Sequence, residues 1–111
     1  MGNGEGFSVA SGRDGDAVVI TVQGDLDLAT APQLRDACDA ALESDPDTIR
    51  LDLAGLTFLD SSGISVLVKT HQDAEAAGAE LVLHRVDDRT NRVLEVAGLA
   101  DFFEHSDQPA R

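Results

Sequence analysis

The chain has few groups that could anchor an aromatic interface or form a covalent cross-link. Its 111 residues include no tryptophan, no tyrosine and four phenylalanines. Because tightly packed interfaces usually depend on Trp, Tyr and Arg, we expect any partner to contact aliphatic, polar and charged groups instead. The single cysteine, Cys38, cannot form an internal disulfide, and a cytoplasmic location is the default expectation for such a chain.

Basic residues are also scarce. Eight Lys and Arg stand against 21 Asp and Glu, which gives a formal net charge of −13. Nucleic-acid backbones and anionic lipid headgroups repel such a surface, so we expect no direct binding to nucleic acid or to a membrane. No apolar run approaches the length of a membrane-spanning helix, and the N-terminus lacks the regions of a signal peptide. A partner with a basic face is favoured.

The residue types that build metal and nucleotide sites are not arranged for that purpose. One cysteine and three scattered histidines do not have metal-ligand spacing. The glycines at positions 2, 4 and 6 follow no strand, so they do not form a phosphate-binding loop. We therefore expect neither a metal nor another cofactor.

Apolar patterns of period 2 and period 3.6 alternate along the chain. They predict a flexible tail at residues 1–6, one domain at 7–105 and a frayed tail at 106–111. A last short strand or turn is expected from Phe102 and Phe103. Earlier strands are expected at residues 7–11, 17–23, 48–53 and 80–84.

Helices are expected between these strands. The first begins at Thr30 as N-cap, and the third begins at Asp87 or Asp88 with Val93, Leu94 and Ala97 inward. The second spans about residues 61–77 and places one face inward: Ile64, Leu67, Val68, His71 and Ala74. The order β-β-α-β-α-β-α-β predicts an α/β fold. It has a mostly parallel mixed sheet, packed helices and an antiparallel first pair of strands.

Residues 58–63, Phe-Leu-Asp-Ser-Ser-Gly, are the most informative segment. They place Ser61 at the exposed N-terminal tip of the second helix, where backbone N–H groups and the helix dipole favour a phosphate. Ser61 could therefore be phosphorylated without unfolding the domain. The alternative is purely structural, because Ser and Asp are common at helix starts for capping reasons alone.

This segment, together with Gly24-Asp25-Leu26-Asp27, resembles the STAS-domain family, and in particular the free-standing anti-sigma factor antagonists. The resemblance runs from about Phe7 to Phe103. It implies the STAS fold and a protein whose unphosphorylated form binds an anti-sigma factor serine kinase, which releases sigma factor. Phosphorylation by that kinase reverses the binding, and a serine phosphatase resets the antagonist.

The resemblance also implies the site residues. The phosphoacceptor is Ser61, and Ser62 is a weaker candidate. We expect Asp27 to be exposed beside Ser61. The partner-binding surface comprises Asp25, Asp27, Asp60, Ser61, Ser62 and Gly63.

The same residues are also compatible with other functions. Asp25, Asp27 and Asp60 could be paired carboxylates of a hydrolase, but no positioned histidine or lysine accompanies Ser61, so we expect no enzyme activity. The carboxylates could instead meet basic groups on a partner or cap backbone N–H groups. The rival of a different class is a cytoplasmic STAS subunit of an ABC-type lipid transport assembly, in which the hydroxyl need not be phosphorylated.

Overall fold

The computed structural model describes residues 6–106. Of the tails expected at residues 1–6 and 106–111, all but Gly6 and Ser106 lie outside this range. The order of elements is the predicted β-β-α-β-α-β-α-β. Ser106, assigned to the C-terminal tail from the sequence, is instead the last residue of the final strand. The elements are β1 (Ser8–Asp14), β2 (Ala17–Leu26), α1 (Ala31–Glu43), β3 (Thr48–Leu59), α2 (Ser61–Ala76), β4 (Glu80–His84), α3 (Asp88–Val96) and β5 (Glu104–Ser106).

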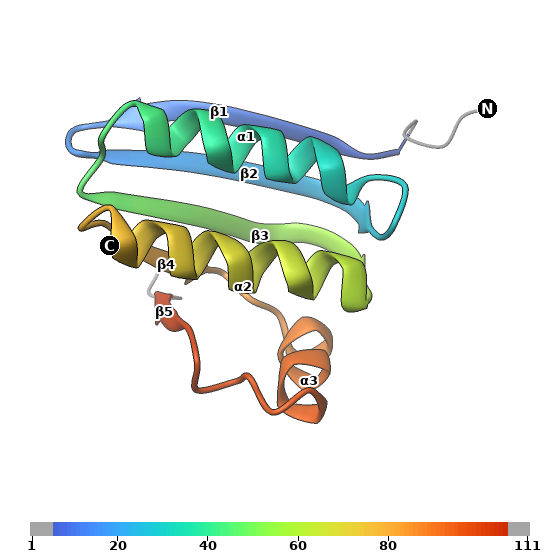
Figure 1. The fold of residues 1–111 in the computed structure, drawn as a ribbon. Helices are drawn as coiled ribbons and strands as arrows, with labels where there is room; N and C mark the ends of the chain where they lie inside the picture. Colours follow the sequence, from blue (N-terminus) through green and yellow to red (C-terminus); the bar gives the residue numbers. More distant parts are fainter. Residues whose placement is uncertain (1–5, 107–111) are drawn as a thin grey trace.

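One five-stranded sheet runs through the molecule in the order β1-β2-β3-β4-β5. β1 is antiparallel to β2, and the remaining neighbours are parallel, which confirms the predicted mixed sheet. α1 and α2 lie side by side over one face of the sheet, and α3 lies at the end where α2 begins (Figure 1). We call the face turned away from α1 and α2 the outer sheet face. None of the helices in the described part of the chain is long and apolar enough to span a bilayer.

The core lies between the sheet and the two helices. Alternate residues of β2, β3 and β4 point inward, as the period of a strand requires. They meet Leu34 and Cys38 from α1 and Leu67 from α2, all fully buried. The inward strand residues are Val18, Ile20, Val22, Ile49, Leu51, Leu53, Leu81 and Leu83.

β2 and β3 are longer than the sequence predicts. β2 continues past Gln23 to Leu26, and β3 continues past Leu53 to Leu59. Two register shifts, between Thr21 and Gln23 and between Gly24 and Asp25, place extra residues in β3. Such bulges break the strict alternation that identifies a strand in a sequence. Residues 24–26, which follow the strand expected at residues 17–23, therefore belong to the sheet.

The helices agree with prediction at most of their ends. α2 ends at Ala76, and Gly78 follows with φ of 79°, as expected for a residue after a C-cap. Its inward face differs from prediction, because Val66 and Thr70 are buried while Ile64, Val68 and His71 are only half-buried. Asp87 is the N-cap of α3 and accepts from Thr90 N–H at 2.8 Å. Ala97, expected inward, is exposed because α3 has already ended.

Candidate functional site

The candidate site lies at the edge of the sheet where the parallel strands end. Leu26 of β2 is paired with Leu59 of β3, and the N–H of Asp60 donates to Leu26 O at 3.3 Å. This pairing sets the residue after each strand at the same level. Asp27 and Asp60 therefore begin neighbouring connections, and residues far apart in the sequence meet at one edge. We call Asp25, Asp27, Asp60 and Ser61 the strand-end site.

Ser61 is the first residue of α2 and is exposed, as predicted. The residue before it, Asp60, is the N-cap with an extended backbone. Asp60 Oδ1 accepts from the N–H groups of Ser62 at 2.9 Å and Gly63 at 3.3 Å. The structural alternative, in which the aspartate caps the helix, is therefore correct for Asp60. It also means that two N–H groups of the helix tip are already engaged, so a phosphate on Ser61 would have to share them.

Gly63 belongs to the packing beneath the site. It is buried, and a Cβ at this position would lie 2.7 Å from both Leu26 Cγ and Leu59 Cδ1. Only a glycine lets the first turn of α2 approach the ends of β2 and β3 so closely. Its grouping with the partner-binding residues is therefore corrected: Gly63 holds Ser61 in position and does not reach the surface.

One carboxylate oxygen of Asp27, Oδ1, stabilises the loop that precedes α1. Its Oδ1 accepts from the N–H groups of Ala29 at 3.0 Å and Thr30 at 3.2 Å. The side chain is half-buried, whereas it was expected to be exposed. Among residues 6–106, no hydrogen-bond donor is recorded for Oδ2.

Thr30 is not the side-chain cap that the sequence predicts. Its hydroxyl donates to Asp25 O at 2.7 Å and accepts from Asp27 N–H at 3.0 Å. Thr30 therefore closes the loop onto the end of β2. Asp27, three residues earlier, satisfies the N–H groups that precede α1.

A hollow of about 460 Å³ opens beside Asp25 and Asp27. The exposed Asp25 accepts from the Thr57 hydroxyl at 2.6 Å, which fixes one of its oxygens. Of the described residues that line it, the two charged ones are acidic, so the hollow suits a cationic group. Its lining residues are Gly6, Phe7, Gly24, Asp25, Asp27, Ala29, Thr30 and Thr57.

Two large apolar side chains near the site are unusually exposed. Leu28, next to Asp27, is 77% exposed. Phe58, the second-last residue of β3, is 50% exposed. Their exposure was not predicted from the sequence. The signal that could have revealed Leu28 is its position directly after Asp27, where the alternation of apolar and polar residues has already ended.

No histidine lies within the strand-end site. His71 is in the third turn of α2 and packs against Phe102, with ring centroids 4.5 Å apart. His84 and His105 are on β4 and β5. Within residues 6–106, the strand-end site therefore combines Ser61 with carboxylates but with no positioned imidazole base.

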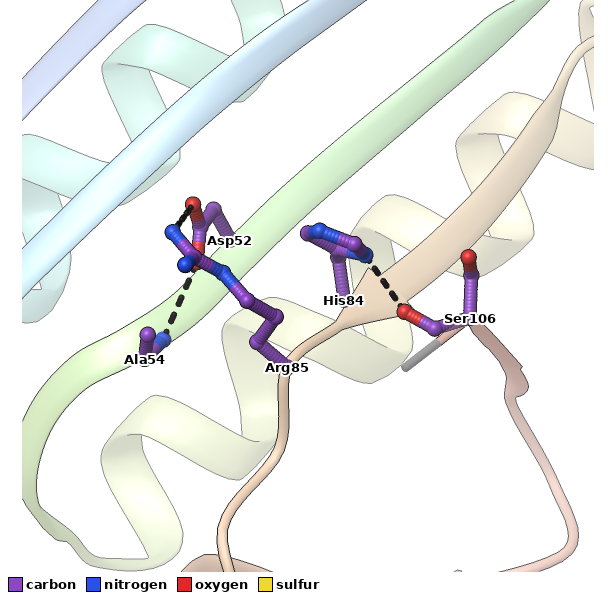
Figure 2. A network of polar contacts seen from close by, with 5 residues as sticks. All are labelled: Asp52, Ala54, His84, Arg85 and Ser106. Carbon is purple, nitrogen blue, oxygen red and sulfur yellow. Dashed lines mark hydrogen bonds and ion pairs between the residues drawn. The ribbon is translucent and has the colours of Figure 1, made fainter. Parts of the chain in front are cut away.

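A second polar cluster lies on the outer sheet face, away from the strand-end site (Figure 2). Asp52, which is 8% exposed, binds Arg85 through two contacts. His84 Nδ1 contacts Ser106 O beside them. Burial alone would raise the pKa of Asp52, but hydrogen bonds from Arg85 and from Ala54 N–H, with the charge of Arg85, hold it below its ordinary value. This pair was not predicted from the sequence, because its two residues are far apart along the chain.

Comparison with known proteins gives one family. The model of the STAS domain matches residues 9–110. A curated relative, the anti-sigma-B factor antagonist of Listeria monocytogenes, is 34% identical over 92 residues, which are 83% of this chain and 81% of the relative.

Solved structures show the same fold. An anti-sigma factor antagonist from Mycobacterium paratuberculosis superposes with a TM-score of 0.80 at 24% identity, covering 98% of this chain and 92% of that one. The Bacillus cell fate determinant SpoIIAA in its phosphorylated form gives 0.68 at 23% identity, with 92% of each chain covered.

Proposed function

Since the chain belongs to the STAS-domain family, and within it to the anti-sigma factor antagonists, we propose that Ser61 is its phosphorylation switch. The unphosphorylated protein binds an anti-sigma factor that is also a serine kinase, and sigma factor is released. Phosphorylation of Ser61 ends this binding, and a serine phosphatase restores it. The observation that supports the proposal is an exposed serine at the first position of α2, at the end of the sheet where Asp25 and Asp27 also lie.

The physical basis of the switch is charge. A phosphoryl group adds about −1.5 to −2 charges at neutral pH. Asp25, Asp27 and Asp60 lie at the same edge of the sheet and repel it. A partner surface shaped for a neutral hydroxyl and for these carboxylates then meets a hydrated dianion. A charge left unmatched at an interface costs about 2–5 kcal/mol, which is a loss of affinity of roughly 30-fold or more.

The partner surface should complement the strand-end site. We infer that a basic side chain of the kinase enters the hollow beside Asp25 and Asp27 and that aliphatic groups contact Leu28 and Phe58. This agrees with the net charge of −13 and the few aromatic residues. The protein itself supplies no catalysis in this scheme, because the kinase and the phosphatase carry out the chemistry. We place the exchange in the cytoplasm, where ATP and sigma factor are available.

The relatives named above favour an antagonist over a subunit of a lipid transport assembly. The two functions also differ in one measurable respect. A transport subunit does not need Ser61 to change charge, whereas the proposed antagonist does.

The test uses purified kinase from the same genome with ATP, followed by intact mass measurement and site mapping. We expect a single phosphate on Ser61 and none on Ser61→Ala. In titrations, Ser61→Ala should bind the kinase and stay bound in ATP, while Ser61→Asp should bind at least about tenfold more weakly. A sigma-dependent reporter should be constantly on with the first variant and off with the second.

Ser62→Ala is the matched control, because Ser62 is the neighbouring hydroxyl and is half-buried. It should still be phosphorylated. Mapping of the phosphate to Ser62, or equal affinities of Ser61→Ala and Ser61→Asp, would contradict the proposed function.

A further inference from the structure

A phosphoryl group on Ser61 would enter an already acidic edge. Asp25, Asp27 and Asp60 all belong to the strand-end site, and Asp60 Oδ1 already accepts from the N–H groups of Ser62 and Gly63. The helix tip alone therefore offers less compensation than an uncapped tip. A cationic group near the end of β3 would offset the repulsion between the phosphoryl group and these carboxylates.

Most basic side chains of the described residues are engaged elsewhere. Arg13 donates to Gly15 O and to Ser44 Oγ at the opposite edge of the sheet. Four others are in ion pairs, namely Arg35 with Asp39, Arg50 with Asp14, Lys69 with Asp73 and Arg85 with Asp52. Within residues 6–106, this leaves the two arginines of α3, Arg89 and Arg92.

Among the hydrogen bonds of residues 6–106, Arg89 donates one to the sheet and Arg92 donates none. α3 packs against β3, and Arg89 Nη1 donates to Thr57 O at 3.4 Å. Thr57 is the third-last residue of β3 and precedes Ser61 by four residues. α3 itself lies at the end of the sheet where α2 begins (Figure 1). Arg89 is exposed and forms no ion pair within 4.0 Å among the described residues.

The contact to Thr57 is weak enough to be exchanged. A separation of 3.4 Å is beyond the usual range for an N–H···O bond. A guanidinium bound to phosphoryl oxygens forms charge-assisted bonds, and its planar fork fits two oxygens at once. Arg89 would therefore gain if it exchanged its long hydrogen bond to the neutral Thr57 O for bonds to a phosphoryl dianion.

We propose that Arg89 is the intramolecular receptor for the phosphoryl group on Ser61. In the phosphorylated protein its guanidinium leaves Thr57 O and binds the phosphoryl oxygens, which offsets the repulsion from the strand-end carboxylates. The inference rests on the proposed phosphorylation of Ser61 and adds the residue that stabilises the modified state. It also gives α3 a part in the switch that the sequence motifs did not assign to it.

The test is a double-mutant cycle that does not depend on the kinase. Phosphoserine is incorporated at position 61 during translation, in the wild-type and Arg89→Gln backgrounds, and Tm is measured at low salt. Phosphorylation should lower Tm by about 2–4 °C more in Arg89→Gln than in the wild type. Arg89→Lys, which keeps the charge, should recover part of this difference, and about 1 M NaCl should remove it.

Arg13→Gln is the matched control, because it removes the same charge at the opposite edge of the sheet. It should leave the effect of phosphorylation on Tm unchanged. Equal effects in Arg89→Gln and Arg13→Gln would overturn the proposal, as would a coupling found with Arg92→Gln instead of Arg89→Gln. If the kinase does not modify Ser61 while the cycle shows coupling, the proposed function fails and the receptor role of Arg89 stands.

Discussion

Arg85 donates to both carboxylate oxygens of Asp52 across the outer sheet face, from Nη2 to Oδ2 at 2.6 Å and from Nε to Oδ1 at 3.3 Å. The two residues are 33 positions apart in the sequence. Arg85 adopts a left-handed backbone, with φ of 58°, directly after β4. Asp52 is in the middle of β3, so the pair links the central strand to the connection that leads into α3.

This pair should make stability depend on pH. The folded-state pKa of Asp52 is lowered, so its contribution is present above the unfolded-state pKa of about 3.9 and is lost as the pH falls through the folded-state value. We predict that Asp52→Asn lowers the free energy of unfolding by about 1–3 kcal/mol at neutral pH. Urea denaturation between about pH 7 and pH 3 should show this cost shrinking in acid.

Asp36→Asn is the control for that series, because Asp36 is exposed on α1 and the substitution removes the same charge. It should leave stability nearly unchanged. Arg85→Gln breaks the pair from the other side and should show the same pH window. A cost of Asp52→Asn that does not vary with pH would contradict the role assigned to the pair.

Asp27 allows capping to be separated from charge. Asp27→Ala removes the acceptor for Ala29 and Thr30 and should cost about 1 kcal/mol of stability. Asp27→Asn keeps an oxygen acceptor but removes the charge, so it should fold almost normally and bind the kinase more weakly. Thermal melts and binding titrations of the two variants decide the matter. Normal kinase binding by Asp27→Asn would limit Asp27 to a structural role.

The packing at Gly63 predicts a position-specific effect. A methyl group there meets Leu26 and Leu59 at 2.7 Å, so Gly63→Ala should destabilise the domain by about 1–3 kcal/mol and displace the first turn of α2. Gly12→Ala is the control, since a Cβ at Gly12 meets nothing within 4 Å. Similar urea midpoints for the two variants would show that the α2 terminus adjusts freely.

Cys38 should be unreactive in the native protein. Burial raises the pKa of its thiol from 9.0 to about 11, against a smaller opposing effect of a hydrogen bond with Thr70. The neutral thiol therefore persists in the folded state, and its contribution to stability declines only as the pH rises through that interval. Reaction with a chromogenic disulfide at about pH 8 should be slow until denaturant is added. Rapid stoichiometric labelling without denaturant is the contrary result.

The order of the elements could be predicted because strong periodic patterns and turn residues separate them. Residues 17–23 are β-branched and apolar, and Gly78 and Gly98 mark the ends of two helices with φ of 79° and 77°. The place of Ser61 at a helix tip followed from the same local signals. These features depend on neighbouring residues alone, which is why the sequence contains them.

The remaining features depend on contacts between distant residues. The ends of β2 and β3 were missed because register shifts interrupt the alternation and because Gly and Asp are unfavourable in strands. β1 runs to Asp14 although its residues are mostly exposed, since pairing with β2 and not burial holds it in the sheet. The roles of Asp27, Gly63 and Arg85 likewise follow from what the fold brings beside them.

The Gly15–Asp16 turn joins β1 to β2 at the edge of the sheet opposite Ser61. Asp16 O accepts from Asp47 N–H at 2.9 Å, so the turn is fixed to the start of β3, and the ten residues of β2 separate it from the strand-end site by roughly 30 Å. Asp16 is exposed, whereas Cys38 is fully buried. A fluorophore attached through Asp16→Cys would therefore label one position and leave the strand-end site accessible. The labelled protein could then report the binding and release of partners by fluorescence.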